Sequence, residues 1–324
     1  MKLVPGALLC VAVACAATLL GILLPIVGAP VFSILLGLTI ASIRPLPASF
    51  EPGIAFASKM LLQWSIVLLG AHLSLSEIVH GGLASLPVML GTLIVVLAVA
   101  YAVGRLLGID RDLRRLLAIG TAICGGSAIA ALSGVIDVDR SDVAYALGTI
   151  FAFNVVAVLT FPALGHLFGF SQSAFGLWAG TAINDTSSVV AAAFAYGTAA
   201  GSAAVVVKLT RTLLIVPIVG YYAWRRIAAH EGGPIDWIAI VPWFILWFII
   251  AAAIDSLGWI PGAWQDPLQQ VALFTIVVAL AGVGLSSDLR RIRAAGLRPL
   301  TLGAILWVTI AVSSLAIARL AHVG

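Results

Sequence analysis

The sequence predicts an all-α polytopic membrane protein, that is, a chain that crosses a lipid bilayer many times as helices. Of its 324 residues, 62% are hydrophobic and only 9% are charged, and the mean hydropathy is +1.17. A soluble domain has about 25% charged residues. Apolar stretches of membrane-crossing length also follow one another along the whole chain. We therefore expect residues 1–324 to form a single integral membrane domain in contact with the lipid bilayer.

About eleven stretches are long enough, or nearly so, to cross roughly 30 Å of hydrocarbon, which takes about 20 helical residues. In chain order they are residues 4–27, 29–44, 54–75, 83–108, 115–135, 143–168, 173–197, 203–225, 236–256, 267–286 and 298–321. Lys2 precedes the first stretch, as in a signal peptide, but this apolar run is about twice the usual signal length and a second stretch follows at once. We therefore expect a helix there too.

Lys and Arg residues concentrate in every second connection between these stretches. Cytoplasmic loops of membrane proteins carry an excess of such residues. The basic connections hold Lys2, Arg44, Lys59, Arg105, Arg111, Arg114, Arg115, Arg225, Arg226, Arg290, Arg291, Arg293 and Arg298, whereas those near 26–29, 75–82, 197–202 and 257–266 hold none. This pattern predicts a cytoplasmic N-terminus and a periplasmic or extracellular C-terminus.

A repeated polar motif interrupts the fifth and seventh stretches. Residues 120–131 read GTAICGGSAIAA and residues 180–191 read GTAINDTSSVVA. Unpaired polar groups cost several kcal/mol each in lipid, so a protein-lined cavity or a ligand must face them. We therefore expect broken or re-entrant helices near 120–128 and 180–188. If both stretches span the membrane they run in the same direction, whereas two re-entrant hairpins would enter from opposite faces.

A second similarity favours inverted repeats. Residues 68–86 resemble residues 280–300, and seven elements separate the third stretch from the tenth. An odd offset means opposite orientation in the membrane, and inverted repeats that meet near the midplane are common in transporters. Packing of small residues between helices is the alternative explanation.

The composition of the two motifs favours the binding of an anion. A helix interrupted at Gly125 and Gly126 exposes amides at the start of its second half, and these amides attract an anion together with the helix dipole. Hydroxyl groups near both breaks add donors. The predicted substrate-binding residues are Thr121, Cys124, Gly125, Gly126, Ser127, Asn184, Thr186, Ser187, Ser188, Lys208 and Arg211. The alternative is that these small residues only let helices pack closely.

Three charged residues stand out within the apolar stretches. Asp185 lies in the interior of the seventh, where a charge costs at least about 2.5–3.5 kcal/mol. We expect it to couple transport, as a proton carrier or a cation ligand, or to pair with Lys208 or Arg211. These two cations share one helical face. Arg211 suits bidentate binding of an oxyanion and Lys208 acts as a point charge, unless both only extend toward the interface.

Three further residues form a second tier of candidates. Asn154, in the sixth stretch, either bonds a neighbouring helix or reaches the cavity. Lys59 and Gln63 are four positions apart on one helical face. They either line a cytoplasmic vestibule or lie at a solvated helix end. Asn184, which is one of the predicted substrate-binding residues, either orients the substrate or caps a half-helix.

Several motifs together resemble the YeiH-type family of bacterial inner-membrane proteins, which is often labelled as sulfate exporters. They are GTAICGGSAIAA, AGTAINDTSSVVAAAFAYG at 179–197, VVKLTRTLLIVP at 206–217 and FASKMLLQWSIVLLGAHLS at 56–74. The resemblance covers nearly the whole chain. It implies a secondary transporter of the bacterial inner membrane, related to folds with crossed broken helices. Some relatives are expected to have His or a similar residue where this chain has Asn184, so the resemblance implies no proton role for that position.

The leading hypothesis is a secondary active transporter that exports a small inorganic or sulfur-containing anion by alternating access. Coupling to H⁺ or Na⁺ would involve Asp185. An anion channel is the alternative, and an intramembrane enzyme built on Ser127 is a remote one, because no convincing base and orienting group accompany it. We expect no enzyme activity, cofactor, metal or nucleic acid partner, since the chain lacks a P-loop and metal-ligand spacing. The sequence leaves the oligomeric state open, a homo-oligomer included.

Overall fold

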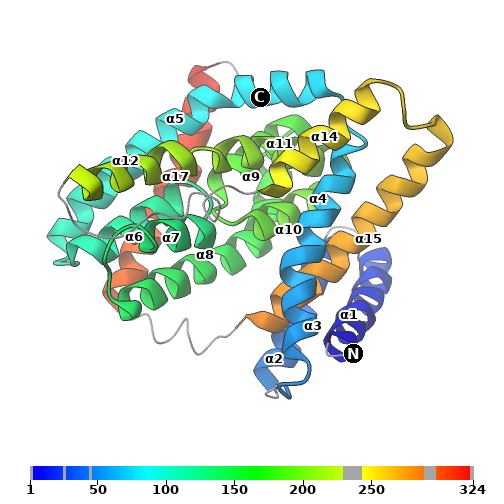
Figure 1. Ribbon diagram of the computed structural model, residues 1–324, viewed down its shortest axis with the longest axis horizontal. Helices are drawn as coiled ribbons and strands as arrows, with labels where there is room; N and C mark the ends of the chain where they lie inside the picture. Colours follow the sequence, from blue (N-terminus) through cyan, green and yellow to red (C-terminus); the bar gives the residue numbers. More distant parts are fainter. Residues whose placement is uncertain (1–2, 25–26, 44–45, 229–242, 288–296, 322–324) are drawn as a thin grey trace.

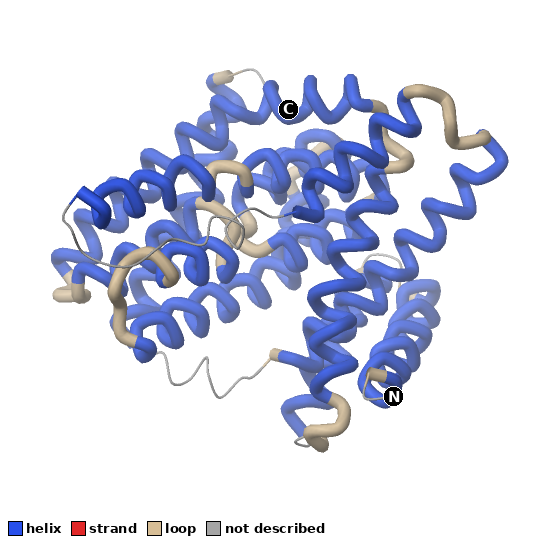
Figure 2. The backbone as a smooth tube through the Cα atoms, viewed as in Figure 1, coloured by secondary structure: helices blue, strands red, loops and turns tan. Residues whose placement is uncertain are grey.

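The computed structural model describes residues 3–24, 27–43, 46–228, 243–287 and 297–321, and every regular element in these ranges is helical (Figure 2). The helices are α1 (Val4–Leu23), α2 (Gly28–Ile43), α3 (Glu51–Ala55), the π-helix η1 (Phe56–Leu61), α4 (Leu62–Gly70), α5 (Leu75–Leu106), α6 (Arg111–Ala122), α7 (Gly126–Ser133), α8 (Arg140–Leu167), α9 (Gln172–Ala182), α10 (Thr186–Tyr196), α11 (Thr198–Thr212), α12 (Ile215–Ala228), α14 (Trp243–Ser256), α15 (Gly262–Ser286) and α17 (Leu297–Leu320).

Seven helices in the described ranges are long and apolar enough to cross a membrane, judged by length and composition. They are Val4–Leu23, Glu51–Gly70, Leu75–Leu106, Arg140–Leu167, Thr198–Arg226, Gly262–Ser286 and Leu297–Leu320. The shorter apolar helices α2 and α14 accompany them. The prediction of an all-α polytopic membrane protein is confirmed. Outside the described residues lie residues 25–26 of the first predicted stretch, 236–242 of the ninth, 288–296 of the 280–300 similarity, and Lys2, Arg44, Arg290, Arg291 and Arg293.

The helices form two groups (Figure 1). Helices α1, α2, α3–η1–α4, α14 and α15 pack on one another and form what we call the scaffold group. Helices α5 to α12 and α17 form the hairpin group. Apolar side chains join the two groups, with Val31 and Ile34 of α2 in the same buried cluster as Val190 of α10 and Val205 of α11.

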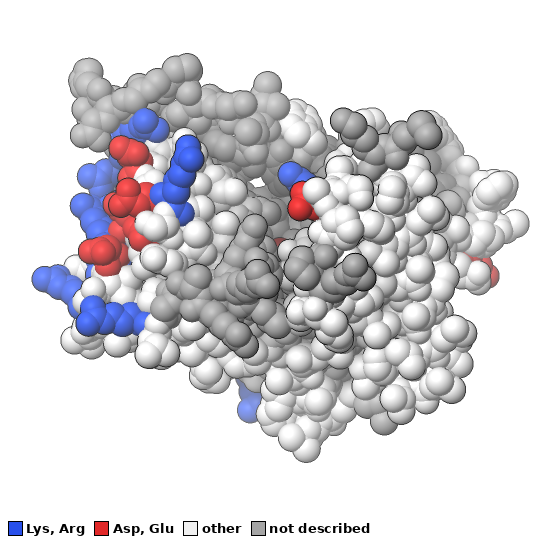
Figure 3. Space-filling model, turned by 90° about the horizontal axis from the view of Figure 1, so that it is seen from below, with Lys and Arg blue, Asp and Glu red and all other residues white. Residues whose placement is uncertain are grey.

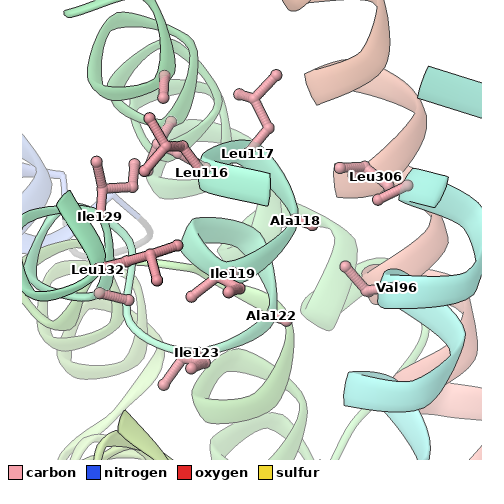
Figure 4. Close-up of a cluster of buried hydrophobic side chains, with 14 of the residues drawn as sticks. Val96, Leu116, Leu117, Ala118, Ile119, Ala122, Ile123, Ile129, Leu132 and Leu306 are labelled. Atoms are coloured by element: carbon pink, nitrogen blue, oxygen red, sulfur yellow. The ribbon is translucent and has the colours of Figure 1, made fainter. Parts of the chain in front are cut away.

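The fifth predicted stretch is a re-entrant hairpin, which we call hairpin 1 (α6 and α7). Its two ends lie beside the last turns of α12: the Arg115 guanidinium lies 5.8 Å from the Tyr222 ring, and Arg226 Nη1 donates to the carbonyl of Val135 at 2.7 Å. A helix that spanned the membrane would place these ends on opposite faces. Figure 4 shows side chains of α7, among them Ile129, turned toward those of α6.

The seventh predicted stretch is also a re-entrant hairpin, hairpin 2 (α9 and α10). Gln172, at the start of α9, accepts a hydrogen bond from the Ala200 amide at 2.9 Å and donates to the Tyr196 carbonyl at 3.4 Å. The Tyr196 ring, at the end of α10, stacks on Phe175 of α9 with 3.9 Å between ring centroids. Both ends of this hairpin therefore lie at the start of α11.

The two hairpins enter the hairpin group from opposite ends. The single apolar helix Thr198–Arg226, made of α11 and α12, connects their openings, since hairpin 2 opens at its start and hairpin 1 at its end. The GTAI repeat is thus an inverted pair, and the re-entrant alternative is confirmed. In the scaffold group, α15 runs antiparallel to α3–η1–α4 (Figure 1). This arrangement agrees with the inverted similarity between residues 68–86 and the described part of 280–300.

Charged side chains gather at one end of the molecule, whereas most of the face in Figure 3 is uncharged. This end holds the opening of hairpin 1 and the end of α12. We call it the basic end, because both segments carry Arg residues. Asp142, at the start of α8, has Asp110 and Asp112 of the hairpin 1 opening among its electrostatic neighbours. The first turns of α6 and α8 therefore share this end, as a re-entrant hairpin between them requires.

Candidate functional site

The tips of the two hairpins meet inside the hairpin group. A Cβ added to Gly125 would lie 3.4 Å from Asp185 Cβ and 3.3 Å from Ile150 Cγ2 of α8. Gly125 has a φ of +68°, which L side chains rarely adopt. Glycine at this position therefore both ends α6 sharply and lets hairpin 2 approach. Gly125 and Asp185 are equivalent positions of the GTAI repeat.

Lys208 and Arg211 of α11 join the two hairpins, and both side chains are fully buried. Lys208 Nζ donates to the carbonyls of Ile123 (3.0 Å), Ile183 (2.9 Å) and Asn184. Arg211 donates from Nε to Ala122 (2.8 Å), from Nη2 to Thr121 (2.9 Å) and from Nη1 to the carbonyl of Thr181. Each cation thus binds equivalent carbonyls of both repeats.

These bonds satisfy the carbonyl ends of α6 and α9. The last carbonyls of a helix have no partner within the helix, and they carry a partial negative charge. Two helix ends that converge away from water therefore favour buried cations. Neither Lys208 nor Arg211 forms an ion pair with Asp185. Within the described ranges the one ion pair joins Arg115 Nη1 to Asp112 Oδ1 at 2.8 Å. The expected alternative of a countercharge for Asp185 is therefore not what the structure shows.

Helix α10 of hairpin 2 begins at a charged cap. Asp185 Oδ2 accepts hydrogen bonds from the Ser187 amide at 3.0 Å and from the Ser187 hydroxyl. Asp185 Oδ1 accepts none from the described residues. Asp185 and Thr186 are half-buried, whereas Ser187 and Ser188 are buried. One carboxylate oxygen is thus structural, and the other is open to a partner.

Helix α7 of hairpin 1 begins without such a cap. No side-chain hydrogen bond caps it from Gly125. The amides of Gly126 and Ser127 meet no acceptor in the part of the chain that the structure describes. Gly126 is half-buried and Ser127 is exposed. The positive end of α7 is therefore the more accessible anion-attracting group at the tips.

Three unpartnered polar atoms are buried at or beside the tips: Thr121 Oγ1, Asn154 Nδ2 and Asn184 Oδ1. Asn154 Oδ1 accepts from the Asp185 amide at 3.4 Å. Its Nδ2 belongs to the same amide group and therefore lies beside the tip of hairpin 2. A buried unpaired donor or acceptor costs about 1–3 kcal/mol, so each of these atoms would be stabilised by a polar partner.

Two candidates of the second tier lie on the scaffold group. Lys59 of η1 is exposed and Gln63 of α4 is half-buried, in a helix that packs on α15. Neither side chain makes a hydrogen bond within the described ranges, so neither is tied to the tips. The structure brings Asn154 closer to the site than its second-tier rank suggested. Ile150, which contacts the tip of hairpin 1, gave no sequence signal because an apolar residue in an apolar helix is unremarkable.

The comparison with known families matches residues 5–303 to the family described as "Conserved hypothetical protein 698", the YeiH family. The chain belongs to this family. It is 39% identical over 323 residues to a UPF0324 membrane protein of Streptococcus agalactiae serotype V, which covers 96% of each chain. It is 41% identical over 327 residues to one of Streptococcus pyogenes serotype M6, covering 98% of this chain and 96% of the relative.

A third relative, a UPF0324 membrane protein of Clostridium tetani, is 39% identical over 304 residues, which cover 89% of this chain and 88% of the relative. The names of these relatives and the apolar helices together make this chain a membrane protein of the YeiH family. The resemblance inferred from the motifs is confirmed.

Proposed function

We propose that this protein is a secondary active transporter of a small inorganic or sulfur-containing oxyanion, which binds between the tips of the two hairpins. One observation carries the proposal: the hairpins enter from opposite ends, and their tips touch at Gly125 and Asp185. A ligand held at the tips is separated from each end of the molecule by one hairpin. This geometry suits alternating access, because opening either side of the tips would expose the same site to a different compartment.

In this proposal the described residues at the tips have different roles. The Gly126 and Ser127 amides and the Ser127 hydroxyl donate to the anion, which replaces part of its hydration shell. Lys208 and Arg211 hold the two tips together and bind the carbonyls at the ends of α6 and α9, so an anion does not face bare carbonyls. Asp185 Oδ1 is the open acceptor at the tips, for a coupling proton, a coupling cation or a donor group of the substrate. The basic end faces the cytoplasm by the distribution of Lys and Arg.

The test is transport by the purified protein in proteoliposomes. Vesicles loaded with unlabelled anion should accumulate labelled anion by saturable counterflow, for at least one of sulfate, sulfite, thiosulfate or hydrogencarbonate. Orientation-selected vesicles then report direction, with export from the basic end expected. Steady anion current without counterflow would instead support a channel. The absence of flux for every small anion, with correctly inserted protein, would overturn the proposal.

A further inference from the structure

The tips hold donors and acceptors that have no partner among the described residues. The donors are the amides of Gly126 and Ser127 and the Ser127 hydroxyl on hairpin 1, together with the unpartnered Nδ2 of Asn154 on α8, a side chain that is 3% exposed and whose Oδ1 accepts from the Asp185 amide. Donors require an acceptor, and the oxygens of an oxyanion are acceptors. The donor side therefore specifies a ligand with at least two acceptor oxygens.

Two acceptors without a partner among the described residues lie on hairpin 2. Asp185 Oδ1 receives no hydrogen bond from the described residues, and Asn184 Oδ1, on the preceding residue, is buried without a partner. An acceptor requires a donor, such as an O–H group. A fully deprotonated oxyanion has no donor to offer, so it would leave this side of the site unsatisfied.

The charge balance at the tips points the same way. The two full positive charges, Lys208 and Arg211, are fully buried, and each donates to three carbonyls of the α6 and α9 ends. What remains open is the partial charge at the start of α7, about half a unit, beside the carboxylate of Asp185. Neither buried cation forms an ion pair with Asp185 in the described ranges, so a dianion at Asp185 Oδ1 would meet a full negative charge that no cation contacts directly.

We infer that the substrate is a monovalent oxyanion that carries its own proton, with its bare oxygens against hairpin 1 and its O–H donated to Asp185 of hairpin 2. This inference rests on the proposed function and names the substrate class of that site. Hydrogencarbonate, hydrogensulfite and dihydrogenphosphate have the required chemistry. Sulfate lacks the proton and has one charge too many, and acetate or nitrate has the charge but lacks the O–H.

The direct test uses a pair of ligands that differ at one group. Acetate has a methyl where hydrogencarbonate has its hydroxyl, and both carry one negative charge. The binding of each to the wild-type protein in detergent is measured from the shift of its melting temperature, at a pH where hydrogencarbonate predominates and at constant ionic strength. Hydrogencarbonate should bind about 10- to 100-fold more tightly than acetate, as expected for one hydrogen bond to a charged acceptor. Sulfate should bind more weakly than either.

The variant Asp185→Asn sharpens this test. An asparagine keeps an oxygen for the Ser187 cap but removes the charge, so sulfate should gain affinity and the preference for hydrogencarbonate over sulfate should fall by about tenfold or more. Asp139→Asn is the matched control, because Asp139 is exposed at the start of α8 and its side chain caps nothing. It should leave the preference unchanged.

The outcomes separate the inference from the function on which it rests. If acetate or sulfate binds to the wild-type protein as tightly as hydrogencarbonate does, the substrate class is wrong although anion transport stands. If none of the three anions binds and none is transported, the proposed function fails as well. The wild-type comparison of the three ligands does not depend on whether Asp185→Asn folds.

Discussion

Hairpins 1 and 2 begin alike and end differently. Both start with Gly-Thr-Ala-Ile, and the carbonyls of these residues bind the same two cations of α11. After the Ile, hairpin 1 continues with Cys124-Gly125-Gly126 and hairpin 2 with Asn184-Asp185-Thr186. The shared half of each repeat is therefore structural, and the half that differs faces the candidate site. The equivalent carbonyls of the two repeats bind Lys208 and Arg211 and so hold the tips together, whereas the residues that differ between the repeats supply the chemical groups of the candidate site.

The difference has a physical reason at the point of contact. Gly125 and Asp185 occupy equivalent positions and touch each other. Two carboxylates about 4 Å apart would repel by roughly 4 kcal/mol at an effective dielectric constant of 20. In addition, the φ of +68° at Gly125 is one that residues with a side chain rarely adopt. One hairpin can carry the charge only if the other leaves room for it.

The largest expected effect is an all-or-none pattern of accessibility that tests the opposite openings. In a protein with Cys10, Cys15 and Cys124 replaced, single cysteines are introduced as Asp110→Cys and Asp137→Cys for hairpin 1, and as Ser171→Cys and Ala199→Cys for hairpin 2. All four positions are exposed. A membrane-impermeant maleimide should label the first pair from one face of the membrane and the second pair from the other.

Labelling of Asp110→Cys and Asp137→Cys from different faces would mean that residues 111–135 span the membrane, and the inverted pair would be wrong. Labelling after detergent solubilisation is the control that each cysteine can react at all. The same result also decides orientation, because the basic end should be reached only from the cytoplasmic face.

Arg211→Ala should have the next largest effect, on stability. The substitution leaves the carbonyls of Thr121, Ala122 and Thr181 without their donors in a buried place. Each buried acceptor that loses its donor costs about 1–3 kcal/mol. We expect a large fall in melting temperature in detergent and little protein in the membrane. Loss of binding in a protein of unchanged stability would instead mean that Arg211 touches the anion.

Arg225→Ala is the matched control for that variant. Arg225 lies exposed in the last turn of α12, and its loss should change the melting temperature little, since exposed substitutions stay within about 0.5 kcal/mol.

Gly125→Ala should have an intermediate effect and acts on the contact between the hairpins. The positive φ of Gly125 costs a residue other than glycine about 1–3 kcal/mol, and the new methyl would press against Ile150 at 3.3 Å. We expect lower stability together with a loss of counterflow. Gly134→Ala, at the other end of α7, is the control, because its φ is −75° and an added Cβ would meet nothing closer than 3.6 Å. Equal effects of the two variants would mean that stability and counterflow do not depend on the contact between the hairpin tips.

The sequence was sufficient for the class of the fold and for the two breaks, because a Gly-Gly pair and an Asn-Asp pair within apolar stretches are strong local signals. It was not sufficient to decide whether those stretches span the membrane. That choice depends on pairs far apart in sequence, such as Gln172 with Ala200 or Arg226 with Val135, and Lys and Arg counting gives the same sides either way. The carbonyl partners of Lys208 and Arg211 were hidden for a similar reason, since backbone acceptors leave no trace in residue type.

The smallest expected effect compares the two serines at equivalent positions, Ser127 and Ser187. Ser187→Ala removes the hydroxyl bond to the Asp185 carboxylate, so it should lower the melting temperature, by about 1.5–3 kcal/mol in unfolding free energy. Ser127 is exposed and its hydroxyl bonds no described residue. Ser127→Ala should therefore leave stability nearly unchanged and weaken anion binding about two- to tenfold, the range for one neutral hydrogen bond. Because each substitution removes the same single oxygen, the two melting and binding measurements control each other. The opposite result, with binding lost only in Ser187→Ala, would move the anion to hairpin 2 and leave hairpin 1 with a structural role.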